Sequence, residues 1–231
     1  MSPPARALVA RLRSLRNQRN IDGMRRFGIV SRHEQLGIGM TPLRVLARPH
    51  RRDHALAREL WATGIFEAMA LATIIDDPRR VTRRQAESWV RDCDNWALTD
   101  ACAFLIDRTD FAAEKALAWS ARRAEFVKRT GFAIMAGMAT HRKELGDEVF
   151  RRFLPVIRRE AGDGRNFVKK AVNWALRGIG KRNPRLRRAA MAEARRILRL
   201  DTPPARWIAR DALRELERRP SGRRPRMSRR S

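Results

Sequence analysis

Trp96 and Asp100 are the two residues whose types and spacing most suggest chemistry. They lie four residues apart in the segment 95–107 (NWALTDACAFLID), so in a helix they stand one turn apart on one face. A core stripe occupies the other side: Leu98, Cys102, Leu105 and Ile106. We expect the face that continues through Ala103 and Asp107 to point away from the core. A carboxylate beside an indole can stabilise a developing positive charge and position a water molecule. The alternative is a structural Trp beside a solvated carboxylate.

A second constellation lies in residues 165–183 (RNFVKKAVNWALRGIGKRN). On a helical wheel Trp174 falls at the border between an apolar arc and a basic face. That face carries Lys170, Asn173, Arg177 and Lys181, and Arg182 follows. An aromatic ring flanked by cations can press on a sugar or base while its neighbours hold phosphates. This pattern equally fits a core Trp beside a solvated basic face.

Arg129, in the segment FVKRT (126–130), begins an almost wholly apolar stretch. The N-terminus of a helix favours negative charge, so a helix-dipole role explains this cation poorly. This favours a binding role for Arg129 slightly more than for an average arginine.

The charge of the chain points to a polyanionic partner. Its 231 residues carry 52 Lys and Arg against 25 Asp and Glu, a formal net charge of +27. Nucleic acid fits best, ahead of an anionic membrane surface or an acidic protein. An Arg-rich protein without such a partner is the remaining alternative. The two cysteines fit neither a disulfide framework nor a zinc spacing, and we expect no metal or cofactor. No apolar run of about 18 residues predicts a membrane span.

The elements that must position these residues are helices. The apolar spacing predicts an all-α chain. Glu67 lies in a helix that is expected to be mostly buried, so we expect it to be a structural hydrogen-bond acceptor rather than a catalyst. Short helices are expected over 53–63, 65–75, 82–90, 95–107, 111–119, 122–140, 147–160, 164–180, 185–200 and 204–218. Loose pairs of about 35 to 45 residues favour a HEAT-like solenoid with a concave basic groove over a globular helical bundle. We expect residues 1–26 to form a basic arm that docks on the fold or orders only on a phosphate backbone. Residues 27–218 form the repeat domain, and residues 219–231 are expected to be a disordered basic tail.

Together these segments resemble the DNA alkylation repair family, the AlkD-like DNA glycosylases. The matching residues are LWATGIFEAMALA (60–72), the pair Trp96 and Asp100, the K-R-T with Arg129, and NFVKKAVNWALRGIGKRN (166–183). The resemblance covers about residues 27–217. It implies HEAT-like repeats that bind double-stranded DNA and hydrolysis of the N-glycosidic bond of cationic alkylated purines, such as 7-methylguanine and 3-methyladenine. This is a step of base excision repair.

The resemblance also implies roles for individual residues. Trp96, Trp174 and Asp100 would lie against the lesion-bearing nucleotide, and Arg129 would hold the nearby backbone. Family members often carry a second acid directly after the tryptophan, where this chain has Ala97. That departure leaves a non-catalytic HEAT-like nucleic-acid-binding protein as the alternative. An RNA-binding or ribosome-associated protein is a third interpretation, because charge does not distinguish DNA from RNA. We expect a cytoplasmic monomer, associated with the nucleoid in a bacterium.

Overall fold

The protein is an array of short helices. The computed structural model describes residues 1–218, and within them the only β-type pairing is an isolated bridge between Glu34 and Ile65. The first half contains α1 (Pro3–Ser14), α2 (Gln18–Arg26), α3 (Met40–Ala47), the 3-10 helix η1 (Arg48–His50), α4 (His54–Trp61), α5 (Phe66–Ile75) and α6 (Arg83–Asp92). The second half contains α7 (Trp96–Ile106), α8 (Ala112–Ser120), α9 (Glu125–His141), α10 (Asp147–Arg159), α11 (Asn166–Gly180), α12 (Pro184–Leu198) and α13 (Pro203–Glu217). The expected helices from residue 53 onward are confirmed.

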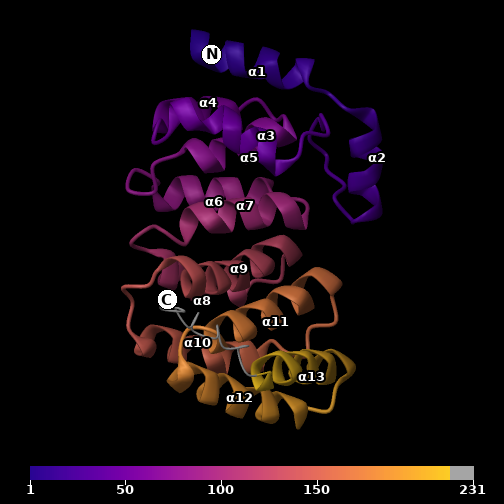
Figure 1. Ribbon diagram of the computed structural model, residues 1–231, viewed down its shortest axis with the longest axis vertical. Coiled ribbons are helices and arrows are strands. Elements are labelled where there is room, and N and C mark those ends of the chain that lie inside the picture. Colours follow the sequence, from indigo (N-terminus) through magenta and orange to yellow (C-terminus); the bar gives the residue numbers. More distant parts are fainter. Residues whose placement is uncertain (219–231) are drawn as a thin grey trace, which may run out of the picture.

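The helices alternate between two layers along the long axis of the molecule (Figure 1). Helices α5, α7, α9, α11 and α13 pack on one another in succession, and we call them the odd-numbered layer. Helices α4, α6, α8, α10 and α12 form the even-numbered layer, in which α8, α10 and α12 are in contact. A short connection joins each even-numbered helix to the odd-numbered helix that follows it, as in HEAT-like repeats. The structure therefore confirms the repeat solenoid over the globular bundle.

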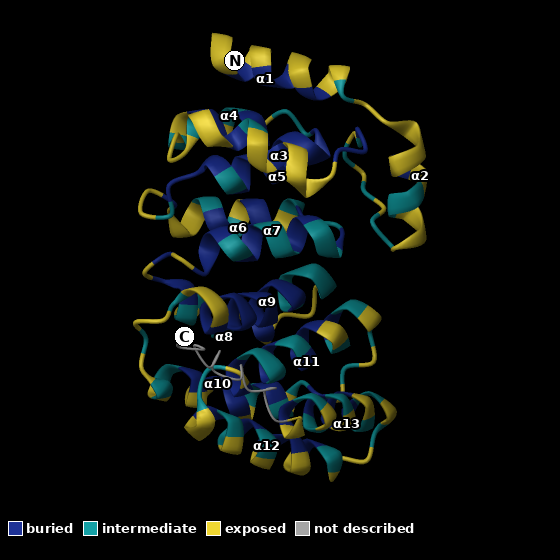
Figure 2. Cartoon of the chain, in the orientation of Figure 1, coloured by how far each residue is buried: buried dark blue, intermediate teal, exposed yellow. Residues whose placement is uncertain are grey.

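The core lies between the two layers, where Figure 2 shows the buried residues. Helix α9 is central, because it packs on α7, α8 and α11. From Arg129 to Ala139 every residue of α9 is buried, as the apolar stretch predicted. Gly131 permits a close approach, since a Cβ there would lie 2.5 Å from the backbone nitrogen of Ser120 in α8. The helix that carries Arg129 is thus held rigidly by three neighbours.

The N-terminal segment is docked on the array. Helix α1 packs against α4 and buries four side chains, those of Ala5, Leu8, Val9 and Leu12. Helix α2 follows, although it buries only Ile21 and so gave little periodic signal. Of the two states expected for residues 1–26, the structure shows the docked one.

The connection from α2 to α3 is fixed by Glu67 on α5. Its fully buried carboxylate accepts hydrogen bonds from the backbone N–H groups of Leu36, Gly37 and Ile38, at 2.7 to 3.2 Å. The structural role expected for Glu67 is confirmed. The expected tail, residues 219–231, lies outside the described residues. In the part of the chain that the structure describes, no helix is both long and apolar enough to cross a membrane.

Candidate nucleic-acid interface and active site

Asp100 and Arg129 form a two-point ion pair between neighbouring helices of the odd-numbered layer. The Nε and Nη2 groups of Arg129 on α9 donate to Oδ1 and Oδ2 of Asp100 on α7, at 3.0 and 2.8 Å. The Nη1 group donates to the backbone carbonyl of Phe167 at 2.7 Å. Arg129 therefore joins α7, α9 and the start of α11.

Asp100 is less exposed than its helical face predicted. Its side chain is 17% exposed, and that of Arg129 is 7% exposed. Burial raises the pKa of the Asp100 carboxyl, and the charge and hydrogen bonds of Arg129 oppose that rise. In this structure the Arg129 guanidinium is hydrogen-bonded to Asp100 and to the carbonyl of Phe167. The expected phosphate contact of Arg129 stays a prediction.

The expectation that the whole Trp96 face points away from the core is wrong at its C-terminal end. Ala103 and Asp107 are fully buried, because α9 packs over them. Gly137 of α9 comes so close that a Cβ at this position would overlap the Asp107 carboxylate. The open part of the face is thus confined to its first turns.

Trp96 is held at the start of α7 by the backbone of a distant segment. Asn95 caps the helix by accepting from the N–H groups of Ala97 and Leu98, each at 3.1 Å. The indole Nε1–H donates to the carbonyl of Phe27 at 2.9 Å, and the Arg129 guanidinium lies 6.0 Å from the Trp96 ring centroid. The half-buried ring therefore has a fixed orientation beside the carboxylate.

The segment that holds Trp96 is itself pinned to the start of α7. The Asp94 carboxylate accepts from the Ser31 hydroxyl at 2.9 Å and from the backbone N–H of Arg32 at 2.6 Å. The side chain of Phe27 remains 74% exposed. This loop thus presents a large apolar ring at the surface next to Trp96.

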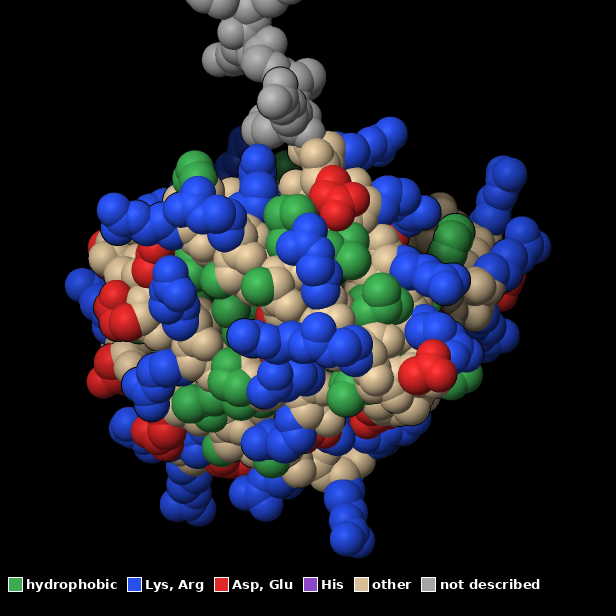
Figure 3. All heavy atoms as spheres, turned by 90° about the horizontal axis from the view of Figure 1, so that it is seen from below, with side chains coloured by type: hydrophobic (Ala, Val, Ile, Leu, Met, Phe, Trp, Pro, Cys, Tyr) green, Lys and Arg blue, Asp and Glu red, His purple; other side chains and the backbone are tan. Residues whose placement is uncertain are grey.

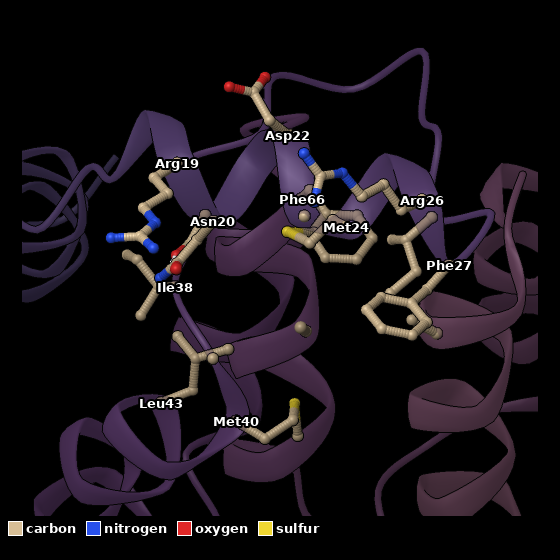
Figure 4. Close-up of a pocket in the computed structure, with 16 residues that line it drawn as sticks. Arg19, Asn20, Asp22, Met24, Arg26, Phe27, Ile38, Met40, Leu43 and Phe66 are labelled. Atoms are coloured by element: carbon tan, nitrogen blue, oxygen red, sulfur yellow. Dashed lines mark hydrogen bonds between the residues drawn. The ribbon is translucent and has the colours of Figure 1, made fainter.

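A cavity of about 670 Å³ opens beside this loop, between α2, α3 and α5 (Figure 4). Ile38 and Leu43 lie across it from Phe27 (Figure 4). Phe66 and Ala97 also line the cavity. Through Ala97 the cavity therefore adjoins Trp96 at the start of α7.

Trp174 lies on α11 and contacts α7 through Phe104. The two ring centroids are 5.8 Å apart at 85°, an edge-to-face arrangement. Phe104 follows Asp100 by one helical turn and is half-buried. Trp96, Asp100 and Trp174 therefore belong to adjacent parts of the odd-numbered layer, linked by Arg129 and Phe104.

The basic residues predicted around Trp174 divide into three groups. Lys170 is exposed and its ammonium group makes no ion pair within residues 1–218. Arg177 and Lys181 each pair with Glu215 of α13. Arg182 is turned inward, where it donates to the carbonyls of Ala139 and Leu145 at 2.9 and 3.0 Å.

Asn173 and Arg182 do not lie on an exposed basic face as predicted. Asn173 is buried, and its side-chain amide donates to the carbonyl of Ile208 at 3.1 Å. The Arg182 guanidinium also stacks on the Phe150 ring, 4.0 Å from its centroid. Cations are nevertheless widespread at the surface, as the end view in Figure 3 shows.

Two contributors to the site were not found from the sequence. Phe104 shares the face of Asp100, and its helical spacing could have identified it. Phe27 contributes a backbone carbonyl from 69 residues away along the chain, for which no local pattern exists.

The comparisons with known proteins agree with this fold. The sequence profile of the DNA alkylation repair enzymes matches residues 8–216, so the chain belongs to that family. The match includes most of α1 and all of α2, which the expected range of 27–217 left out. No curated protein sequence matches the chain.

One solved structure shares the fold with a TM-score of 0.73 and 19% sequence identity, covering 82% of this chain and 81% of its own. It was described under the heading "A new family of proteins related to the HEAT-like repeat DNA glycosylases with affinity for branched DNA structures". At this identity the likeness establishes a HEAT-like fold.

Proposed function

We propose that this protein is a DNA glycosylase that hydrolyses the N-glycosidic bond of cationic alkylated purines in double-stranded DNA. The observation that carries the proposal is the Asp100 carboxylate, which Arg129 holds at both oxygens beside the fixed indole of Trp96. Trp174 completes the set on the adjoining helix of the same layer.

The chemistry needs few groups, because the substrate supplies part of the activation. An alkylated purine such as 7-methylguanine or 3-methyladenine carries a formal positive charge and leaves as a neutral base. No general acid is then required to protonate it. The sugar passes through an oxocarbenium-like state, as in other glycoside hydrolyses. A carboxylate near that carbon stabilises the developing charge and can accept a proton from the attacking water.

The Arg129 pair determines how Asp100 can act. A carboxylate held at two points cannot rotate, so its remaining lone pairs have a fixed direction. The 17% exposed fraction of the side chain leaves a face for a sugar or a water molecule. The indole rings of Trp96 and Trp174 add their negative faces, which attract cationic character. We infer that the three side chains surround the lesion-bearing sugar, with the exposed cation of Lys170 near the phosphate backbone.

The direct test is release of modified bases from DNA. The full chain is incubated in excess with methylated duplex DNA, and free 7-methylguanine and 3-methyladenine are measured in a single turnover. Asp100→Asn should abolish release while DNA binding persists or tightens, since an anion leaves an anionic interface. Asp110→Asn, at an exposed carboxylate outside the site, is the matched control and should excise normally. Undiminished release by Asp100→Asn would refute the assignment.

A second candidate function is non-catalytic binding of DNA. Ala97, in place of the second acid, favours it, and so does the described affinity of the structural neighbour for branched DNA. Binding is then measured on a four-way junction and on a duplex of equal length. Absence of base release together with a clear preference for the junction would establish this alternative.

A further inference from the structure

We propose that a second cavity, bounded by α3, α5, α7 and α9, binds one nucleotide unit of the DNA strand adjoining the lesion site. Its phosphodiester would contact Arg44, Arg108 and His141, and its sugar or base would lie on the ring of Phe104. This inference rests on the proposed DNA-directed function and adds to it a strand subsite.

The cavity has the size and the lining of a nucleotide site. Its volume is about 430 Å³, within the range of small-molecule pockets. The wall is aromatic at Phe104, and the remainder of the lining is small or apolar apart from three basic side chains: Met40, Thr73, Ile74 and Ala101, with Arg44, Arg108 and His141. No carboxylate is among these lining residues, so an anion would meet no like charge inside the cavity.

His141 is oriented toward the cavity by a buried carboxylate. Its Nδ1 lies 2.6 Å from Oδ2 of Asp107, whose side chain is fully buried, whereas the imidazole is 38% exposed. The ring packs edge-on against Phe104, with centroids 5.3 Å apart. Within residues 1–218 the opposite nitrogen, Nε2, has no hydrogen-bond partner. A histidine whose Nδ1 is fixed by a carboxylate can use Nε2 for a ligand.

Arg108 is anchored in a way that leaves its outer amino groups available. Its Nε donates to the carbonyl of Phe104 at 2.9 Å, and the side chain is 45% exposed. Its Nε lies 3.9 Å from Oδ1 of Asp107, and that oxygen has no hydrogen-bond partner among the described residues. Asp107 thus draws both His141 and Arg108 to one side of the cavity.

Arg44 supplies the cation on the opposite element, α3. It is exposed and makes no ion pair in the described part of the chain. Arg142, the neighbour of His141, is engaged elsewhere, since its Nη1 donates to the carbonyls of Asp107 and Thr109. The charges that face His141 are therefore Asp107, Arg44, Arg108 and the committed Arg142. The guanidinium groups of Arg44 and Arg108 suit a phosphate ligand, because each can donate two parallel hydrogen bonds to its oxygens.

The cavity adjoins the candidate active site through Phe104. Phe104 contacts His141 on one side and Trp174 on the other. Asp100 lies one turn before Phe104 on α7. A strand that places its lesion at Asp100 would therefore carry a neighbouring nucleotide past Phe104.

The test replaces single phosphates of a short duplex with neutral methylphosphonates and measures binding by the full chain. One position should weaken binding by wild-type protein about tenfold, and Arg44→Ala combined with Arg108→Ala should abolish that penalty. Binding of the double variant to unmodified duplex should lose about one to two units of salt slope. Arg151→Ala, at an exposed and unpaired position on α10 in the even-numbered layer, should retain both the penalty and the slope. His141→Gln and Phe104→Leu should each reduce the penalty in part.

Several outcomes would overturn the subsite. Equal methylphosphonate penalties in the double variant and in wild type, with both folded by thermal melting, would exclude the cavity as the contact. Tight binding of inorganic phosphate that the double variant loses, without any position-specific penalty on DNA, would show a site for a free anion. Absence of base release with the position-specific penalty intact would refute the glycosylase and leave the subsite standing. Absence of DNA binding by the wild type would refute both.

Discussion

The guanidinium of Arg129 donates two hydrogen bonds to the carboxylate of Asp100, at 3.0 and 2.8 Å, and so links α9 to α7. The pair lies at the surface edge of the core, with 7% of the arginine and 17% of the aspartate side chain exposed. Pairing compensates for the cost of burying each charge, and removal of either partner leaves the other uncompensated. Arg129 is therefore a positioning residue for Asp100 in this structure.

Arg129→Gln tests that role against the phosphate contact expected from the sequence. Loss of the two-point hold should lower the single-turnover rate of base release about a hundredfold, because the carboxylate is no longer fixed. The salt slope of duplex binding should change by less than one unit, since the guanidinium is buried. Lys170→Ala, at an exposed cation on α11, should lower the slope by about one unit. A fall of one unit for Arg129→Gln would show that Arg129 leaves Asp100 to bind the backbone.

Trp96→Phe separates the hydrogen bond of the indole from its aromatic face. The variant loses the Nε1–H that donates to the Phe27 carbonyl at 2.9 Å but keeps a ring beside Asp100. We expect base release to slow about tenfold, which corresponds to one hydrogen bond of about 1.4 kcal/mol. Trp96→Ala should slow it further. Trp207→Phe, at a 41% exposed tryptophan on α13, is the control; a defect in it equal to that of Trp96→Phe would contradict the assignment.

The positions of most helices could be predicted from the sequence, but many contacts between helices could not. Apolar spacing located α9, whose burial is dictated by its composition. It also assigned Glu67 correctly, because a carboxylate inside an apolar helix must be satisfied by neighbouring donors. In these cases the role of the residue follows from its own segment, although the donors that satisfy Glu67 lie 29 to 31 residues away along the chain.

The partners of Arg129 and Arg182 could not be predicted in the same way. Each guanidinium is satisfied by groups at least 29 residues away along the chain, and helical periodicity says nothing about which neighbour covers a given face. The burial of Asp107 has the same origin, since Gly137 lets α9 approach it closely. Helix α2 was not predicted, because Ile21 is its only buried residue.

Asp107 should make stability depend on pH below neutrality. Burial raises the pKa of this carboxyl to about 6, from an ordinary value of 3.8. The unfolded chain therefore loses this proton at lower pH than the folded protein. The contribution of Asp107 to the unfolding free energy is fully present below pH 3.8 and is lost as the pH rises through about 6. The loss amounts to about 3 kcal/mol.

The unfolding free energies of wild type and Asp107→Asn, measured by denaturant titration from pH 4 to pH 7, check this sign. The amide cannot ionise, so the variant should gain stability relative to wild type as the pH rises. His141 also loses its hydrogen bond to the carboxylate in the variant. Asp110→Asn, at an exposed position, should run parallel to wild type. If the unfolding free energy of Asp107→Asn minus that of wild type falls as the pH rises, the raised pKa of Asp107 is contradicted.

Ala97→Asp tests whether the missing second acid limits catalysis. Position 97 lies in the first turn of α7, where a carboxylate interacts favourably with the helix dipole. It also adjoins Trp96 and lines the cavity beside Phe27. An added anion there would strengthen the field at the sugar bound against Asp100, so we expect base release to accelerate severalfold while the melting temperature stays close to that of wild type. Ala97→Asn has nearly the same shape without the charge and should leave the rate unchanged. An equal gain in both variants would assign the effect to packing, and a loss confined to Ala97→Asp would show that this site is adapted to a single carboxylate.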